Sequence, residues 1–422
     1  MIAELLFFVF VVILWVFEFV PSHVTALLVI VLAPVLGFVS FNQVQECLAD
    51  DVIMLFIGVF VLTNVMVKHN ILKKIFLRIL PRTPIDLEKV VLITSGFTFL
   101  ISAFLSNTVV TSILLPIVLI LANYGCDNFK VRLLLSLTFF SNLGGLLTPM
   151  GTPPNGITLA NLRNVGVEVT ILSWFLKAAP VSLTCGALCY LFLKFIFPVK
   201  KNHEVVLAND TPLFESSSHK GAPSGFTITE ILLIGAFLAC VFIWVITVFV
   251  PNVPLWFSPW VVCLVLWVIQ TTIPRKKVVL LELSDIQQIP WDTIILFTGG
   301  LVLGEFVEQS QLLGFLKTAE YFTSHPIMAA FLTVLLSNFA SNTASASVMT
   351  PIFAQIQPSF GMLVGLASSF GFLLPVSTPT NALIYGTGLV PLKKLMVTGL
   401  LVDILGLLVL ALFFRLGFLS VW

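Results

Sequence analysis

The chain has 422 residues, of which 58% are hydrophobic and 10% are charged, and its mean hydropathy is +1.09. These values exclude a water-soluble globular protein, and a formal net charge of +1 does not favour a nucleic-acid partner. Apolar runs of about 18 residues or more recur along the chain, which is typical of an all-α polytopic membrane protein embedded in a lipid bilayer.

The order of apolar and polar segments predicts one structural unit in residues 1–200. It should contain scaffold helices, a hairpin, a broken helix and a final long helix. The predicted ranges are 1–85 for the scaffold (with crossings at about 3–20, 24–41 and 52–68), 88–123 for the hairpin, 130–167 for the broken helix and 169–197 for the last helix.

A polar segment at 201–225 holds Asn-Asp-Thr-Pro and a run of three serines, and we interpret it as a cytoplasmic linker. The order of the first unit then returns in residues 226–422. The predicted ranges are 226–310 for the scaffold helices, 326–358 for the hairpin, 360–389 for the broken helix and 394–418 for the last helix.

Two Ser-Asn-Thr tripeptides, at 106–108 and 341–343, indicate that the two units are copies. Each tripeptide follows another serine by four residues and precedes a proline by eight, so an offset of 235 maps one onto the other. The offset is 241 between Phe56 and Phe297 and 226 between Asn155 and Asn381. Loop lengths therefore differ while the core segments correspond, and we interpret the chain as an internal duplication.

The turns at the two tripeptides lack a polar loop, since Leu105 and Val109 flank the first one directly. Irregular backbone at membrane depth must be surrounded by protein or line a cavity. We therefore expect two re-entrant hairpins and two broken transmembrane helices. Each unit would then cross the membrane five times, an odd number, which makes the chain an inverted-topology repeat.

The distribution of Lys and Arg predicts the orientation. With the hairpin of the first unit entering from the cytoplasm, 17 of the 21 basic residues lie on the cytoplasmic side, as the positive-inside rule requires. Both termini are then outside, Cys47 is external and Cys126 is cytoplasmic. We expect a multi-pass protein of a bacterial inner membrane.

The residue types at the tripeptides and helix breaks suit the binding of ions. Ser, Asn and Thr are N-cap residues, and Pro153 and Pro379 suit the first turn of a helix. Helix N-termini carry partial positive charge and free N–H groups, which favour an anion, while carbonyls at broken helices bind monovalent cations. These motifs contain no Lys, Arg, Asp or Glu. An inverted repeat with such breaks is typical of a secondary transporter with its site at the repeat interface.

The chain resembles the divalent anion/sodium symporter (DASS) family, to which INDY-like sodium-dependent dicarboxylate transporters belong, over nearly its whole length. The resemblance lies in the two tripeptides and in the motifs at 151–155 and 377–381. It implies homodimers that work by an elevator mechanism. The substrate residues that it implies are Asn107, Thr108, Asn342, Thr343, Thr378 and Pro379. The implied sodium residues are Ser102, Ser106, Asn107 and Gly151 for one site and Ser337, Ala340, Asn342 and Ser377 for the other.

One departure from the pattern is Thr380, which stands where the first copy has Pro154. We expect it to loosen the start of the second half-helix. Three acidic residues fall inside apolar segments, and for these we favour interface or headgroup contacts over a proton relay. They are Glu18, Glu305 and Asp403.

The resulting hypothesis is a sodium-coupled symporter that imports di- or tricarboxylates such as succinate, malate or fumarate, with Na⁺ as coupling ion and no organic cofactor. The residues leave the anion open among C4-dicarboxylates, citrate and sulfate. A dicarboxylate exchanger or an antiporter relative is the alternative. We do not expect an enzyme, because no His–Ser or paired-Asp constellation lies at the repeat interface, and the opposed half-length hairpins favour alternating access over a channel.

Overall fold

The computed structural model describes residues 2–81, 85–199, 204–205, 226–246, 253–272, 280–310 and 325–420, so most of the predicted linker lies outside the described residues. In the first half its elements are helices of eight to 26 residues and one very short strand. They are α1 (Ile2–Phe17), α2 (Ser22–Val35), α3 (Phe41–Leu48), α4 (Asp51–Lys68), α5 (Ile71–Ile79), β1 (Ile85–Asp86), α6 (Leu87–Ser102), α7 (Asn107–Ala122), α8 (Asp127–Gly145), α9 (Pro153–Asn164) and α10 (Ile171–Ile196).

The second half is again helical. Its elements are β2 (Glu204–Val205), α12 (Ile228–Ile246), α13 (Phe257–Thr272), α14 (Leu283–Gln287), α15 (Trp291–Gln309), α18 (Pro326–Phe339), α19 (Asn342–Ile356), α20 (Pro358–Ala367), α21 (Pro379–Gly386) and α22 (Leu392–Arg415). The two strands pair in antiparallel fashion, Ile85 with Val205. The predicted all-α membrane fold is confirmed, and α3 is a short helix that was not predicted from the sequence.

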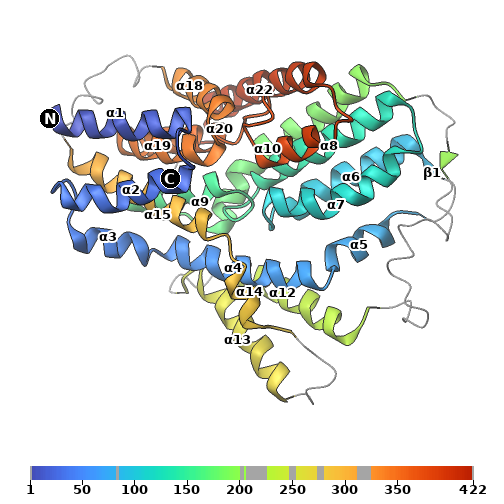
Figure 1. Cartoon of the computed structure of the whole chain (residues 1–422), viewed down its shortest axis with the longest axis horizontal. Coiled ribbons are helices and arrows are strands. Elements are labelled where there is room, and N and C mark those ends of the chain that lie inside the picture. The colour runs from blue at the N-terminus through green and yellow to red at the C-terminus, as the bar shows by residue number, and fades with distance from the viewer. Residues whose placement is uncertain are drawn as a thin grey trace.

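Four helices in the described residues are long and apolar enough to cross a membrane: Phe41–Lys68 (α3 with α4), α10, α12 and α22. Shorter apolar helices of 10–17 residues accompany them, α1, α2, α7 and α18 among them. The α18–α19 pair lies left of centre in Figure 1 and the α6–α7 pair right of centre, with α20 packed against α19 and α8 packed against α6.

Packing between the halves begins with equivalent aromatic residues. Phe56 of α4 and Phe297 of α15 are both buried, and their ring centroids lie 4.6 Å apart at an interplanar angle of 80°. Such edge-to-face pairs stabilise a contact by about 0.5–1.5 kcal/mol beyond the burial of area. The 241-residue offset thus joins two residues that touch in space.

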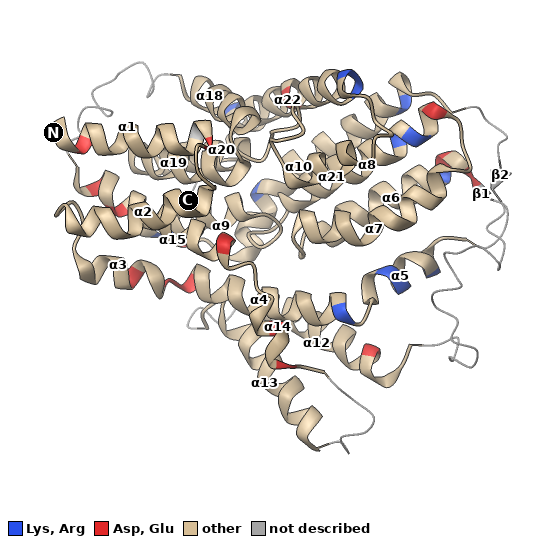
Figure 2. Cartoon of the chain, viewed as in Figure 1, with Lys and Arg blue, Asp and Glu red and all other residues tan. Residues whose placement is uncertain are grey.

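Charged residues are sparse in the middle of the molecule, and Lys and Arg gather around α5 and the adjacent ends of α6 and α8 (Figure 2). Helix α5 buries Ile71, Leu72 and Phe76, while its Lys74 forms an ion pair with Glu230 of α12. The apolar side of α5 therefore packs on protein, and its basic side connects it to helix α12 of the second half.

Candidate functional site

The tip of the first helix pair lies between Ser102, the last residue of α6, and Asn107, the first residue of α7. The Ser102 hydroxyl lies 2.7 Å from the Asn107 side-chain amide. This amide has two possible orientations. In one its nitrogen donates to Asn142 Oδ1 (3.0 Å), and in the other it donates to the carbonyls of Gly151 (3.1 Å) and Ser141 (2.9 Å). The second offers more acceptors and is preferred.

The break between α8 and α9 lies against this tip. A Cβ atom on Gly151 would stand 2.4 Å from the Gly145 carbonyl and 2.7 Å from the Ser102 carbonyl, so only glycine permits this approach. The Asn155 amide nitrogen donates to the carbonyls of Gly145 (2.9 Å) and Thr148 (2.8 Å) and holds the break in shape. In a continuous helix these backbone carbonyls would accept hydrogen bonds from the next turn. Here they lie close together around Gly151.

The second tip repeats this arrangement in α18 and α19. The Ser337 hydroxyl lies 2.6 Å from Asn342 Oδ1 and 2.6 Å from the Ser368 carbonyl. A Cβ atom on Gly371 would stand 2.6 Å from Asn342 Oδ1 and 2.8 Å from the Ser337 carbonyl. Ser341 caps α19 by accepting from the Ala344 N–H at 3.1 Å, whereas the Ser106 side chain makes no capping bond to α7.

The break before α21 also repeats its counterpart. The Asn381 amide nitrogen donates to the Phe372 and Leu374 carbonyls, both at 3.1 Å, and the Ser377 hydroxyl lies 2.6 Å from the Gly371 carbonyl. The expectation that Thr380 loosens this helix start is wrong. The Thr378 hydroxyl accepts from the Asn381 N–H at 3.2 Å and caps α21, whereas α9 has no such cap.

Buried hydrogen bonds connect α8, the first part of the first broken helix, to the second break. The Asn142 amide nitrogen donates to Thr380 Oγ1 at 2.8 Å, and Thr380 Oγ1 lies 3.0 Å from Thr378 Oγ1. Thr138 Oγ1 lies 2.7 Å from Asn381 Oδ1. Neither Asn142 nor Thr138 was predicted from the sequence, where their only signal is an i, i+4 polar pair on an otherwise apolar helix.

The predicted site residues divide into buried and partly accessible groups. Asn107 and Asn342 are each 8% exposed. The other buried residues are Ser102, Gly151, Ser337, Ala340, Ser377 and Thr378. Partly exposed or exposed are Ser106, Thr108, Thr343 and Pro379. The structure thus buries the two asparagines and most of the predicted sodium residues, while Thr108, Thr343 and Pro379 lie toward the accessible side.

Asp403 of α22 is a further buried group beside the second tip. It is 3% exposed, and its carboxylate accepts from the Asn338 amide nitrogen (2.9 Å) and from the Phe372 N–H (3.1 Å). Asn338 Oδ1 in turn accepts from the Leu373 N–H at 2.8 Å. The expected headgroup contact is therefore wrong for this residue, which instead lies at an interface between helices and supports the second break. In the described part of the chain no group of three His, Cys, Asp or Glu side chains could hold a metal ion.

Comparisons with known proteins agree with this architecture. The family model for citrate transporters (CitMHS) matches residues 12–363. The sodium-dependent dicarboxylate transporter SdcS of Staphylococcus saprophyticus is 25% identical, covering 94% of this chain and 82% of that protein. An uncharacterized transporter of Haemophilus influenzae is 27% identical (95% and 88%), and MJ0672 of Methanocaldococcus jannaschii, also an uncharacterized transporter, is 28% identical (95% and 90%).

Among solved structures, MtrF of Neisseria gonorrhoeae, from a class of antimetabolite efflux pumps, matches with a TM-score of 0.57 at 12% identity and covers 90% of this chain and 83% of its own. This likeness shows the fold alone. The protein is an integral multi-pass membrane transporter. The chain belongs to the citrate transporter family, and the predicted membership of the DASS group is confirmed.

Proposed function

We propose that this protein is a sodium-coupled symporter that imports di- or tricarboxylate anions by an elevator-type mechanism. One observation carries the proposal: two hairpin tips, 235 residues apart, each place a serine hydroxyl and an asparagine amide against a glycine break in a neighbouring helix. The name of the SdcS relative supports sodium and a dicarboxylate as the transported pair.

The two oxygen clusters are assigned to sodium. The first comprises Ser102, Ser106, Asn107 and Gly151, and the second comprises Ser337, Ala340, Asn342 and Ser377. Hard monovalent cations bind to carbonyl and hydroxyl oxygens at unwound helix ends. The close approach of the Gly145, Gly151 and Ser102 backbones supports the first assignment, and the matching approach of Gly371 to Ser337 supports the second.

The anion is assigned to the N-termini of α7, α19 and α21, with Asn107, Thr108, Asn342, Thr343, Thr378 and Pro379 as its contacts. Each N-terminus offers free N–H groups and a partial charge of about +0.5. None of these six residues is basic, and the fully buried Arg132 is paired with Glu88, their closest atoms 2.7 Å apart. Bound sodium would therefore supply the charge that offsets a dianion.

We propose that the hairpins and broken helices move together as the transport domain of an elevator-type transporter. The protein would work as a homodimer in a bacterial inner membrane. The hydrogen bonds that join Asn142 and Thr138 of α8 to Thr380 and Asn381 of α21 support a single body. So does the contact between Asn161 of α9 and Thr350 of α19, at 3.4 Å. The burial of Leu105 and Ala340 at the tips supports re-entrant hairpins surrounded by protein.

The test is uptake of labelled succinate, citrate and sulfate into proteoliposomes under an inward sodium gradient, with a potassium gradient as control. Two sodium sites give at least two ions. We expect more than two, so an inside-negative potential imposed with valinomycin should accelerate uptake of a dicarboxylate, by about 2.3 kcal/mol of driving force per 100 mV for each net charge. Uptake that ignores sodium but requires internal dicarboxylate would establish the exchanger instead.

A further inference from the structure

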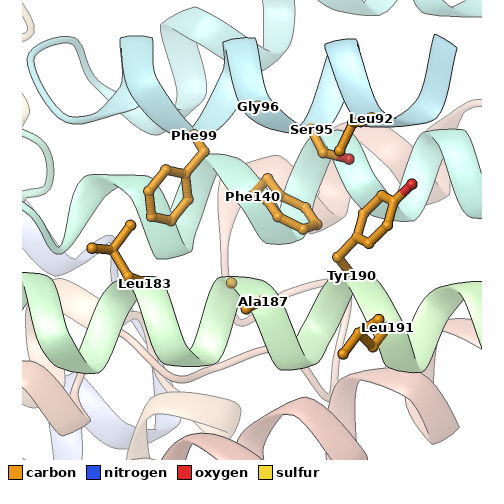
Figure 3. A pocket seen from close by; sticks show the side chains of 10 residues that line it. Leu92, Ser95, Gly96, Phe99, Phe140, Leu183, Ala187, Tyr190 and Leu191 are labelled. Atoms are coloured by element: carbon orange, nitrogen blue, oxygen red, sulfur yellow. The ribbon is translucent and has the colours of Figure 1, made fainter. Parts of the chain in front are cut away.

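A groove of about 440 Å³ runs between α6 and α10 over Phe140 of α8 (Figure 3). Its walls are almost entirely apolar. Leu92 and Leu191 at its rim are 54% and 60% exposed. The Ser95 hydroxyl donates to the Val91 carbonyl at 2.7 Å and so is already satisfied. One wall, α10, is long and apolar enough to cross a membrane, so we expect its exposed surface to face lipid rather than water.

Charged side chains of both signs gather at the end of the groove near Tyr190. Arg132 is fully buried and makes a two-pronged ion pair with Glu88, at 2.7 and 3.0 Å. The Arg132 guanidinium also lies 5.3 Å from the centre of the Tyr190 ring. Lys194 lies 3.7 Å from the same Glu88 carboxylate, and its side chain is 53% exposed. Asp86 also acts electrostatically on Tyr190, so the acids and bases of the cluster balance, and Lys194 is an exposed cation within it.

We propose that this groove is a binding site for an anionic phospholipid. One acyl chain fills the apolar channel between Phe99 and Tyr190, and the phosphate meets the Lys194 ammonium at the open end. Basic pockets between membrane helices on the cytoplasmic side suit anionic headgroups, and each surface Lys or Arg strengthens the attraction about fivefold. The lipid would lie between α6, which is an arm of the first helix pair, and α10. The proposal does not depend on which anion the protein transports.

The experiment measures lipid retention by native mass spectrometry after the full-length protein is mixed with phosphatidylglycerol or phosphatidylcholine in detergent. Wild-type protein should retain phosphatidylglycerol preferentially. Lys194→Ala should lower that retention about fivefold and leave phosphatidylcholine unchanged. Ala187→Phe places a ring in the groove and should lower retention of both lipids. Ala187 is exposed, so this change does not overpack the core.

Two matched variants serve as controls. Lys130→Ala removes another lysine, one that lies 3.5 Å from Asp127, and Leu188→Phe adds a ring at a residue that does not line the groove. Both should retain lipid as the wild type does. Equal retention of the two lipids by the wild type, or retention that neither Lys194→Ala nor Ala187→Phe lowers, would overturn the proposal. Dissociation of an oligomer by Ala187→Phe without lipid loss would instead assign the groove to contact between copies.

Discussion

The two hairpin tips have nearly the same local geometry but different support. In each, a serine at the end of one helix lies 2.6–2.7 Å from the asparagine that begins the next, and both asparagines are 8% exposed. Behind the second tip stand Asn338 and the Asp403 carboxylate. Behind the first, Ala103 occupies the position that the 235-residue offset assigns to Asn338.

This difference separates the contacts that form within each helix pair from the contacts that a neighbouring helix supplies. The Ser-to-Asn contact is local, because it joins residues five apart, and both copies have it. The electrostatic support comes from α22 and is found at the second tip. We therefore expect the two proposed sodium sites to differ in stability and affinity although their inner ligands match.

The predicted membrane orientation of the two tips can be tested by cysteine labelling, whose result is all or none. All six cysteines are described, and only Cys126 is exposed, so the buried Cys47 is unsuitable as the external probe. A Glu46→Cys variant that lacks Cys126 supplies an exposed external position instead. An impermeant maleimide added to intact cells should label that variant and spare wild-type Cys126. The reverse pattern would invert both hairpins.

Asp403→Ala should have the largest effect on stability. It leaves the Asn338 amide and the Phe372 N–H without their acceptor, and a hydrogen bond to a charged group contributes about 1.5–3 kcal/mol. We expect a loss of about 3 kcal/mol or more, measured as a lowered thermal midpoint in detergent. Asp403→Asn, which retains one acceptor oxygen, should lose less. Equal midpoints for Asp403→Ala and wild type would remove the proposed asymmetry.

Asn107→Ala and Asn342→Ala each delete a proposed substrate contact and a proposed sodium ligand. A loss of about 1.5–3 kcal/mol corresponds to a roughly 10- to 150-fold rise in the half-saturating concentration of substrate or sodium. Proteoliposome uptake measures both. Asn123→Ala, at an exposed asparagine at the end of α7, is the control and should behave as wild type. Unchanged sodium and substrate curves for both tip variants would refute the site.

Glu305→Gln should have the smallest effect. Glu305 Oε2 accepts from the Gln43 side chain at 3.1 Å, and a glutamine keeps an acceptor oxygen there. We expect transport to change by less than about threefold, as for substitutions away from critical contacts. Abolished transport in this variant, with Asn342→Ala still active, would move the site away from the hairpin tips.

Much of the fold was predictable because membrane helices are recognised in a sequence as long apolar segments. The arms expected at 88–123 and 326–358 contain α6–α7 and α18–α19, and the family followed from the tripeptides and Pro-Asn motifs. Whether the hairpins are re-entrant and the halves inverted stays a prediction. The short helix α3 was missed because its first residues continue an apolar run into a polar stretch.

The supporting residues of the site were not predictable, because their partners are distant in the sequence. Asn142 meets Thr380 across 238 positions and Asp403 meets Asn338 across 65. Thr380 looked like a defect in a copied motif because its pattern lacks the second proline. In the fold its hydroxyl joins the two halves, which a proline could not do.

The Glu88–Arg132 pair bears on the order in which the helices of the first half can pack during synthesis. The two residues are 44 positions apart, so α6 and α7 are both synthesised before the guanidinium that neutralises Glu88 exists. An unpaired carboxylate is costly in an apolar setting, and burying it early is unfavourable. We therefore expect the α6–α7 pair to reach its final position only after α8 has been synthesised.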